Sequence, residues 1–275
     1  MKRVKLLNFF AIAAIGLAVV SCGKKVSPEQ ARLDSIKKDS ITKDSIAKVE
    51  SASANTLTDQ EKTDGVVLLF DGKTTTGWRG YNKTWFPDTV WKVEEGTLHC
   101  MGSGRGEAGA KKGGDIMIDK KFKNFEFSLE WKVQEGGNSG IFYMAQEIPG
   151  KAIWHTALEM QVLDPKHKDA ALGKDGNRQA GSLYDLIPAK PQNMKPGDWN
   201  KAKITVYKGT VIHEQNGEKV LEYHLWTEEW KALVAGSKFP KFNPTYAEVA
   251  EEGIIGLQDH GDDVWYRNIK IKELK

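Results

Sequence analysis

Cysteine and histidine are scarce in this chain, and neither sign of charge prevails. Among 275 residues there are two Cys and six His, and the formal net charge is +3. Two cysteines cannot build the disulfide framework of a small secreted scaffold. The His residues lack the regular spacing of zinc ligands, so no metal is indicated. The small net charge excludes the basic stripe of a nucleic-acid-binding protein, and we expect no nucleic acid among the partners.

A hydrophobic run long enough for a comfortable membrane span is also missing. The mostly apolar segment from Leu6 to Val20 has 15 residues and follows a basic start. This pattern is typical of a secretory signal. Ser21-Cys22 comes next and is similar to the lipobox of bacterial lipoproteins. We therefore expect a signal peptide over residues 1–21 and a mature chain that begins at a lipid-modified Cys22. The alternative is an ordinary signal peptide with an incidental cysteine.

Residues 22–63 differ in composition from the rest of the chain. The repeat DSIKKDSITKDSIAK at 34–48 places Ile at every fifth position, which moves around a helix instead of along one face. The stretch is charged, rich in Ser and free of aromatics, which favours a solvated tether. A short coiled coil is the alternative. No acidic cluster follows Cys22, which favours an outer-membrane anchor facing the periplasm.

Residues 64–275 have the pattern of one all-β domain, and about 210 residues are enough for its own core. Short β-patterned runs alternate with turns, as in a β-sandwich or jelly roll. The predicted strands are 66–70, a hairpin over 91–100, 125–133, 139–145, 157–163, 182–187, a hairpin around 216–217, 253–258 and 264–274. At most one or two short helices are expected. One is predicted at 227–236, between the N-cap Thr227 and Gly236.

The strand at 157–163 has two different faces. In HTALEMQVLD, residues 155–164, the apolar Leu158, Met160 and Val162 alternate with Glu159 and Gln161. A period of two puts the apolar set on the core and the polar set on the opposite face. A carboxylate next to an amide is unusual there, because outward faces more often carry Lys, Thr or Ser. The pattern therefore predicts the floor of a site on a concave sheet surface.

A polar loop between the last two predicted strands is a second candidate for the site. It contains Gln258, Asp259, His260, Asp262 and Asp263, with Arg267 in the strand that follows. Three interpretations stay open. The loop is a surface turn, a Ca²⁺ site formed by its three aspartates, or part of a substrate site. A buried Arg is costly unless a carboxylate or a substrate oxygen pairs with it.

Three further segments have simpler interpretations. The loop at 163–186 has a length more typical of a lid or binding loop than of a plain connection. The Gly-rich residues 102–114 lack a strand and helix around them, so they predict a rim loop and not a phosphate cradle. GGNSG at 136–140 predicts a tight bend, and Ser139 lacks the context of a serine nucleophile.

Five segments in a fixed order carry a resemblance to a known family. They are LFDGKTTTGW (69–78), GGNSGIFY (136–143), LEMQVLD (158–164), AGSLYDLIPAKPQNMKPGDWN (180–200) and IGLQDHGDDVWYRNIKIKEL (255–274). Residues 64–275 resemble the 3-keto-disaccharide hydrolase family of exported bacterial proteins, which implies a concanavalin A-like jelly roll. Two sites depart from the family pattern. Met144 stands where Arg or His is common, and Ala157-Leu158 stand where Gly-Pro is common.

The resemblance implies cleavage of a glycoside that is already oxidised at C3 of the sugar. The ketone acidifies the C2 proton, a base removes it, the enolate expels the group at C1, and water then adds. The candidates for base are Glu159 and His260, and those for acid or orienting group are Asp164, Tyr184 and His155. The candidate substrate-binding residues are Gln161, Gln258, Arg267, Glu130 and Trp154.

The same resemblance implies a carbohydrate substrate and a separate sugar 3-oxidoreductase that supplies the ketone. No cofactor is indicated, and a divalent metal such as Ca²⁺ has no support beyond the aspartates of the polar loop. Two other functions stay open. One is a conventional glycoside hydrolase with two carboxylates, and the other is a carbohydrate-binding lipoprotein without catalysis. The fold alone does not separate them.

Overall fold

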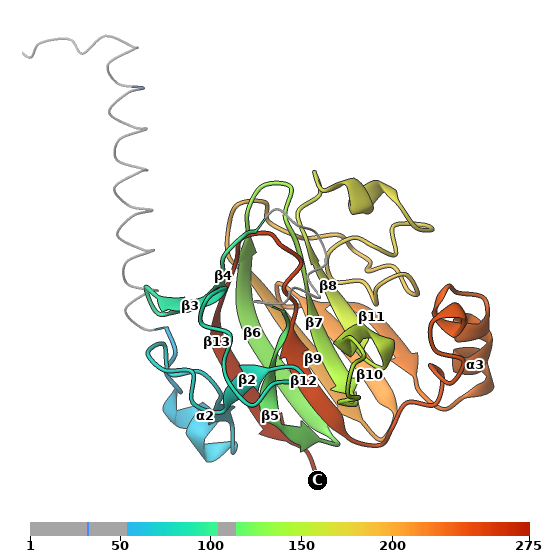
Figure 1. Cartoon of the computed structure of the whole chain (residues 1–275), viewed down its shortest axis with the longest axis horizontal. Helices are drawn as coiled ribbons and strands as arrows, with labels where there is room; N and C mark the ends of the chain where they lie inside the picture. Colours follow the sequence, from blue (N-terminus) through green and yellow to red (C-terminus); the bar gives the residue numbers. More distant parts are fainter. Residues whose placement is uncertain (1–31, 33–53, 104–113) are drawn as a thin grey trace, which may run out of the picture. The chain divides into compact units, whose positions relative to one another are not determined.

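The computed structural model describes residues 54–103 and 114–275, together with Arg32 (Figure 1). The predicted signal peptide, the lipid site Cys22, most of the tether and most of the Gly-rich segment lie outside the described residues. Within the described part, none of the helices has both the length and the apolar character needed to cross a membrane.

Two antiparallel sheets make up the domain. The larger sheet has the order β11-β10-β9-β6-β13-β4-β3, with β1 paired to β13. Its strands are β1 (Val67–Leu68), β3 (Trp91–Glu94), β4 (Thr97–Cys100), β6 (Phe125–Val133), β9 (Asn200–Tyr207), β10 (Thr210–Gln215), β11 (Glu218–His224) and β13 (Val264–Glu273). The smaller sheet has the order β2-β5-β12-β7-β8. Its strands are β2 (Trp78–Gly80), β5 (Ile116–Phe122), β7 (Asn138–Ala145), β8 (Leu158–Leu163) and β12 (Gly253–Leu257).

The helices of the described residues are short. They are α2 (Asp59–Thr63), α3 (Glu228–Ala235) and the 3₁₀ turns η1 (Ile153–His155), η2 (Lys168–Ala171) and η3 (Phe239–Lys241). In Figure 1, α3 lies at the side of the domain where β10 and β11 lie. The expected all-β jelly-roll sandwich with few helices is confirmed.

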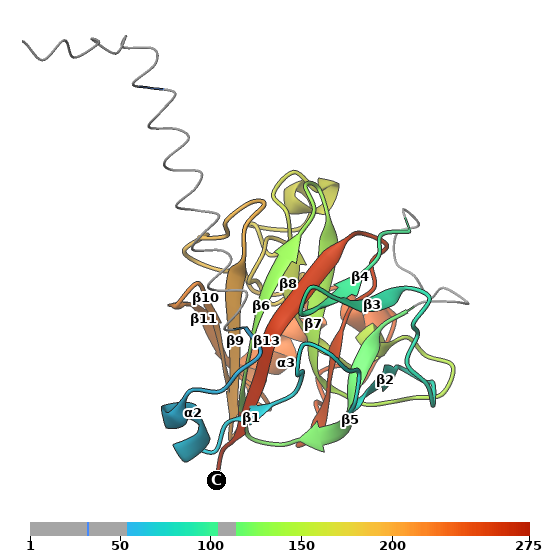
Figure 2. The same cartoon turned by 90° about the vertical axis from the view of Figure 1, so that its left-hand side faces the viewer.

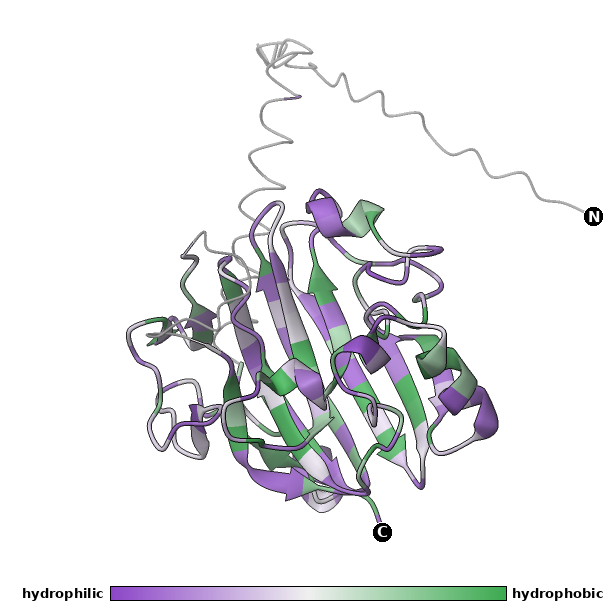
Figure 3. Cartoon of the chain, turned by 45° about the vertical axis from the view of Figure 1, so that its right-hand side comes forward, coloured by the Kyte–Doolittle hydropathy of each residue, from purple (hydrophilic) through white to green (hydrophobic). Residues whose placement is uncertain are grey.

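The main hydrophobic core lies between the two sheets (Figure 2). β6 of the larger sheet contributes alternate residues, among them Phe127 and Trp131, which are 1% and 0% exposed. β8 of the smaller sheet contributes Met160 and Val162 to the same cluster. Figure 3 shows polar and apolar residues alternating along the strands, as expected when only one face of a strand is packed in the core.

Several local predictions are confirmed residue by residue. Strand 125–133 is β6, with the buried face that the alternation predicts. Asn216 and Gly217 join β10 to β11 with positive φ angles of 53° and 85°, the geometry of a primed hairpin turn. Thr227 caps α3, because its side chain accepts a hydrogen bond from the backbone N–H of Trp230, and Gly236 is the C-cap.

Other segments differ from the prediction. Residues 182–187 form isolated bridges instead of a strand, and β1 is shorter than 66–70. No pattern indicated β5, since Asp119 and the two lysines after it interrupt the alternation. Residues assigned to the tether also pack on the domain. The Asn55 backbone N–H donates to Asn268 Oδ1 over 2.6 Å, and α2 places Glu61 2.7 Å from Lys270 Nζ.

One hydrogen-bonded network is buried inside the core. The Tyr143 hydroxyl lies 2.7 Å from His213 Nε2 and 2.7 Å from the Tyr223 hydroxyl, and His213 Nδ1 lies 2.9 Å from the Gly181 carbonyl. His213 Nδ1–H therefore donates to Gly181, and Nε2 accepts from Tyr143. Burial disfavours the imidazolium and lowers the pKa of His213 to about 4.

This burial predicts a pH-dependent loss of stability. An unfolded His titrates near its model value of 6.5, so the unfolded state binds the proton first as the pH falls. The contribution of His213 is complete above pH 6.5 and is lost as the pH falls toward 4. The loss is about 3 kcal/mol of unfolding free energy.

Chemical denaturation of wild type, His213→Gln and His224→Gln at pH 7 and pH 4 measures this contribution. The His213→Gln variant should be less stable at pH 7 and should depend less on pH. His224→Gln is the control, because the His224 side chain is 58% exposed, and it should keep the wild-type pH dependence. If the unfolding free energy changed equally between pH 7 and pH 4 in the wild type and in His213→Gln, the assignment to His213 would be contradicted.

Candidate functional site

A cavity of ≈ 170 Å³ lies beside β8 on the outer face of the smaller sheet. β8 directs Leu158, Met160 and Val162 into the core between the sheets, and its pleat turns Glu159 toward the cavity. The alternation predicted for this strand is therefore present in the structure. Glu159 is 8% exposed, so its carboxylate sits in a largely dehydrated position, where electrostatic interactions are stronger than in water.

Gly140 on β7 makes room for this carboxylate. β7 and β8 are antiparallel, with Gly140 opposite Gln161 and Phe142 opposite Glu159. A Cβ atom at Gly140 would overlap Glu159 Oε1 and lie 2.9 Å from its Cδ. The glycine is needed here for close approach and not for a left-handed backbone. The GGNSG motif thus contributes its last residue to the site, while the bend itself lies at its start, where Gly136 has a φ of 68°.

Aromatic side chains form the wall of the cavity. Trp154 comes from η1, and Phe239, Phe242 and Tyr246 come from the segment after α3. The rings of Phe239 and Tyr246 stack with centroids 4.1 Å apart, and Trp154 meets Phe242 edge-on at 5.5 Å. The Tyr246 hydroxyl donates to the Ala157 carbonyl over 2.6 Å, which ties this segment to β8. A mostly apolar wall with a few polar groups is typical of a small-molecule site.

Tyr184 and Lys238 complete the polar side of the cavity. Tyr184 is held beside Glu159 because its backbone N–H donates to the Glu159 carbonyl over 3.0 Å. Lys238 Nζ donates to the Tyr184 hydroxyl over 3.0 Å and lies 4.2 Å from the centre of the Tyr184 ring. Burial, and next the Glu159 charge, raise the pKa of Tyr184 well above its usual value. The phenol therefore keeps its proton at neutral pH and can donate it.

A chain of amides continues the floor along the sheet from Glu159. Gln161 lies two residues further along β8 on the same face, roughly 7 Å away. Its Nε2 donates to Asn138 Oδ1 over 2.7 Å, and Asn138 Nδ2 lies 3.3 Å from His260 Nε2. The side-chain carbonyls of Gln161 and Gln258 are buried and have no hydrogen-bond partner among the described residues. A buried acceptor without a donor is costly, and neither Gln161 nor Gln258 is among the residues that line the cavity.

His167, His260 and Asp262 bring one potential metal-ligand atom each within 4.8 Å of one another. The hydrogen bonds of the protein compete with an ion at this position. His167 Nδ1 accepts from the Asp169 backbone N–H over 3.1 Å, so the neutral ring carries its proton on Nε2. The Asp262 carboxylate already accepts from the Asn138 backbone N–H over 3.0 Å. His167 and Asp262 thus each have a hydrogen-bond partner outside this group.

The three aspartates of the polar loop do not converge on a Ca²⁺ site in the described structure. Asp259 accepts from the Gly114 backbone N–H over 2.8 Å, while Asp263 lies 2.7 Å from His99 Nε2. Asp262 bonds to Asn138 as described above. The loop uses each carboxylate to hold a different backbone segment, so the Ca²⁺ interpretation of the sequence is not supported.

Two predicted substrate contacts lie on the other side of the sandwich. Arg267 and Glu130 are opposite each other on β13 and β6 of the larger sheet, and Arg267 Nε donates to Glu130 over 2.8 Å. The guanidinium also stacks on Trp199, 4.1 Å from the ring centre. Both side chains point away from the core, because the neighbours of Glu130 on β6 point into it. These two candidate substrate-binding residues therefore do not lie on the sheet face that carries Glu159.

Asp164 and His155 are also separate from the cavity lining. The Asp164 carboxylate accepts from the Lys166 backbone N–H over 2.9 Å and orders the turn after β8. His155 stacks on Trp154 with centroids 4.2 Å apart. Burial, and next the charge of Lys151, lower the pKa of His155. Both residues flank the elements that carry Glu159 and Trp154, and neither lines the cavity with them.

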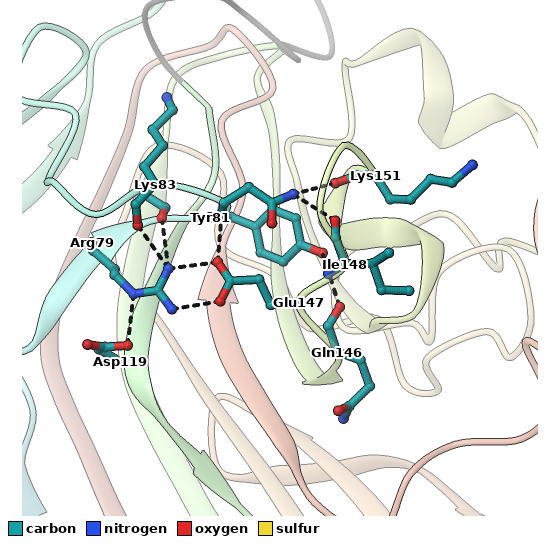
Figure 4. A network of polar contacts seen from close by, with 10 residues as sticks. Arg79, Tyr81, Lys83, Asp119, Gln146, Glu147, Ile148 and Lys151 are labelled. Carbon is teal, nitrogen blue, oxygen red and sulfur yellow. Dashed lines mark hydrogen bonds and ion pairs between the residues drawn. The ribbon is translucent and has the colours of Figure 1, made fainter.

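A network of polar contacts holds the segment that presents Trp154. Figure 4 shows the Arg79 guanidinium between the carboxylates of Asp119 and Glu147. Two of its nitrogens donate to Glu147 over 2.7 Å each, and Nε donates to Asp119 over 2.8 Å. The Tyr81 hydroxyl donates to the Gln146 carbonyl over 3.0 Å. These bonds fix the residues between β7 and η1 to β2, and so they position the tryptophan.

Sequence reasoning missed the residues that the segment after α3 supplies. Lys238, Phe239, Phe242 and Tyr246 lie far beyond Glu159 in the chain, and no periodicity connects them to β8. The only available signal was the position of SKF directly after a well-capped helix. Of the two departures from the family pattern, Met144 is 1% exposed in the main core, whereas Ala157 lines the cavity.

Residues 65–272 match the model of the 3-keto-alpha-glucoside-1,2-lyase-like domain. A 3-keto-disaccharide hydrolase from Bacteroides thetaiotaomicron is 52% identical over 245 residues, covering 82% of this chain and 84% of that protein.

Two crystal structures of candidate glycosyl hydrolases from Parabacteroides distasonis share the fold. One has a TM-score of 0.70 at 31% identity and covers 81% of this chain and all of that one. The other has a TM-score of 0.54 at 27% identity, with 72% of this chain and 99% of that one covered. By its domain match and its sequence identity, the chain belongs to the family of the 3-keto-alpha-glucoside-1,2-lyase-like domain.

Proposed function

We propose that this protein cleaves the glycosidic bond of 3-keto-disaccharides in the cavity beside β8. The observation that carries the proposal is the joint presence of one carboxylate, Glu159, and one protonated phenol, Tyr184, in a cavity with an aromatic wall. An elimination route needs one base and one acid, which is what this pair supplies. Membership in the family, and the activity in the name of the Bacteroides relative, support the same substrate class.

In the proposed reaction Glu159 removes the C2 proton of the oxidised sugar. The electrons of the C2–H bond form the enolate with the C3 carbonyl and then expel the oxygen at C1. Tyr184 gives its proton to that oxygen, and the aglycone sugar leaves as an alcohol. Water then adds across the C1–C2 double bond, with the hydroxyl at C1 and the proton returned to C2 from Glu159. The phenolate of Tyr184 takes the proton that this water loses, which restores the phenol.

The lining of the cavity favours this route over direct displacement. Retaining and inverting glycosidases both need two carboxyl groups around the scissile bond. Glu159 is the one carboxylate among the described lining residues.

The role of Glu159 is tested by Glu159→Gln. This change keeps the shape of the side chain and removes the base, so kcat for a 3-keto-disaccharide should fall by about 10²–10⁴-fold. The assay follows sugar release, and a substrate with deuterium at C2 should react more slowly in the wild type. The unoxidised parent disaccharide should not be cleaved. Faster cleavage of the parent would favour the conventional hydrolase, and sugar binding without any turnover would favour the binding protein.

The position of the carboxylate is tested by Gly140→Ala. The added methyl would occupy the place of Glu159 Oε1 and displace the carboxylate by an amount on the order of 1 Å, which should lower kcat about 100-fold. Gly236→Ala is the matched control, because its Cβ would meet nothing closer than 3.6 Å. Thermal unfolding of both variants separates a displaced base from a damaged fold. Wild-type activity in a folded Gly140→Ala variant would show that the carboxylate position does not matter.

We further propose that the protein is exported and held at the outer membrane, facing the periplasm, through lipid on Cys22. The signal-like start of the sequence and the cysteine after Ser21 support this location. A separate sugar 3-oxidoreductase would act before it, because the proposed substrate carries a ketone that this reaction does not make.

The proposed anchor predicts the location of a cysteine variant. Cys22→Ser should move the protein from the membrane fraction to the soluble periplasmic fraction and should leave activity on 3-keto-disaccharides unchanged, since residue 22 lies in the predicted N-terminal tether. Immunoblots of fractionated cells measure the distribution. Membrane retention of Cys22→Ser would contradict the lipid anchor.

A further inference from the structure

Lys238 has no role in the proposed reaction so far, although it lines the same cavity as Glu159 and Tyr184. The nearest carboxylate to its ammonium is already paired. Asp185, 3.6 Å from Lys238 Nζ, is bound by the Arg178 guanidinium over 2.5 Å. Lys238 therefore shares Asp185 with a second cation, since Arg178 Nε approaches Oδ1 and Lys238 Nζ forms the longer ion pair with Oδ2.

Lys238 combines two polar contacts with two aromatic ones. A lysine ammonium has three donors. One donates to the Tyr184 hydroxyl over 3.0 Å, and another lies toward Asp185 Oδ2 at 3.6 Å. The rings of Tyr184 and Phe239, with centroids at 4.2 Å and 5.7 Å, hold the cation by its π-contacts without neutralising it.

We propose that Lys238 is a catalytic residue that donates a hydrogen bond to the C3 carbonyl oxygen of the substrate and stabilises the enolate formed when C2 is deprotonated. This inference rests on the proposed function and names the feature of the substrate that the cavity recognises, which is the ketone.

The spacing of the two donors fits this role. C1 and C3 of the sugar are the two neighbours of C2, so the oxygens on them flank the carbon that loses its proton. Lys238 Nζ and the Tyr184 hydroxyl are 3.0 Å apart, and each can reach one of these oxygens while Glu159 faces C2. As Glu159 takes the C2 proton, negative charge develops on the C3 oxygen, which accepts a hydrogen bond from the Lys238 ammonium. A cation at this oxygen stabilises the oxyanion.

The environment of the Lys238 ammonium strengthens its interaction with the negative charge that develops on the enolate. Burial lowers the pKa of Lys238, and the charge of Asp185 opposes that shift, as does Glu159 more weakly. A partly desolvated ammonium gains more from an enolate than a hydrated one, because the interaction is less screened. An unoxidised sugar offers a hydroxyl at C3 and develops no such charge, so Lys238 also discriminates the oxidised substrate from its parent.

The test compares Lys238→Met with Lys241→Met, an exposed lysine in the same turn. The substrate is a 3-keto-disaccharide, and the ligands for calorimetry are a 3-keto-monosaccharide and its unoxidised parent. We expect Lys238→Met to lower kcat at least about 100-fold and to abolish the preference of the wild type for the 3-keto-monosaccharide in binding. Lys241→Met should resemble the wild type in both measurements.

Two results would overturn the role of Lys238. One is a folded Lys238→Met variant that keeps kcat within about threefold and the same binding preference, in a wild type that is active. The other is a mass adduct on Lys238 after borohydride reduction with the 3-keto-monosaccharide, which would replace the hydrogen bond by a covalent imine. If the wild type cleaves no 3-keto-disaccharide, the proposed function fails, and the binding preference still tests the contact with the ketone.

Discussion

The site depends on the register between β7 and β8. This pairing sets Gly140 opposite Gln161 and Phe142 opposite Glu159, and it decides which side chains of β8 enter the core. A shift by one residue would exchange the two faces and bury Glu159 between the sheets. The apolar set of β8 prevents that shift, since Met160 and Val162 are fully buried against the larger sheet. The packing that stabilises the sandwich therefore also determines the position of the candidate base, Glu159. Because Gly140 has no side chain, the Glu159 carboxylate has room there.

The faces of single strands could be predicted well, because alternation is a local property of the chain. The sequence could not predict which outer face of the sandwich a polar residue belongs to. Glu130 and Glu159 both lie on the polar face of an alternating strand, yet β6 and β8 belong to different sheets, so the two carboxylates point to opposite sides of the domain. The choice is made by sheet topology, which depends on pairings between distant segments. For the same reason the sequence did not indicate Lys238 as a site residue, because its position near β8 results from the path of the chain after α3.

Strand β8 connects the cavity at Glu159 to a group of buried amides outside the cavity lining. At Glu159 the wall is aromatic and the polar groups are charged or acidic, which suits bond cleavage in a desolvated space. At Gln161 the groups are neutral amides, and the Gln161 side-chain carbonyl has no hydrogen-bond partner among the described residues. Rigid supports hold both ends. Arg79 fixes the segment before Trp154, and the loop after β8 returns along its edge, where Gly181 N–H donates to the Gln161 carbonyl over 2.9 Å. The long loop predicted as a lid is thus partly a supporting edge of the sheet.

The electrostatics of the cavity explain why a ketone is the feature that such a site would recognise. Tyr184 is held in its protonated form by burial, and Lys238 is held close to it as a cation that shares Asp185 with Arg178. Without a ligand, the folded protein contains a partly desolvated charge, which is unfavourable. A neutral sugar hydroxyl offsets little of that desolvation, whereas an enolate oxygen offsets more as negative charge develops on it. The interaction is therefore stronger in the transition state than in the ground state, which is the condition under which binding energy accelerates a reaction.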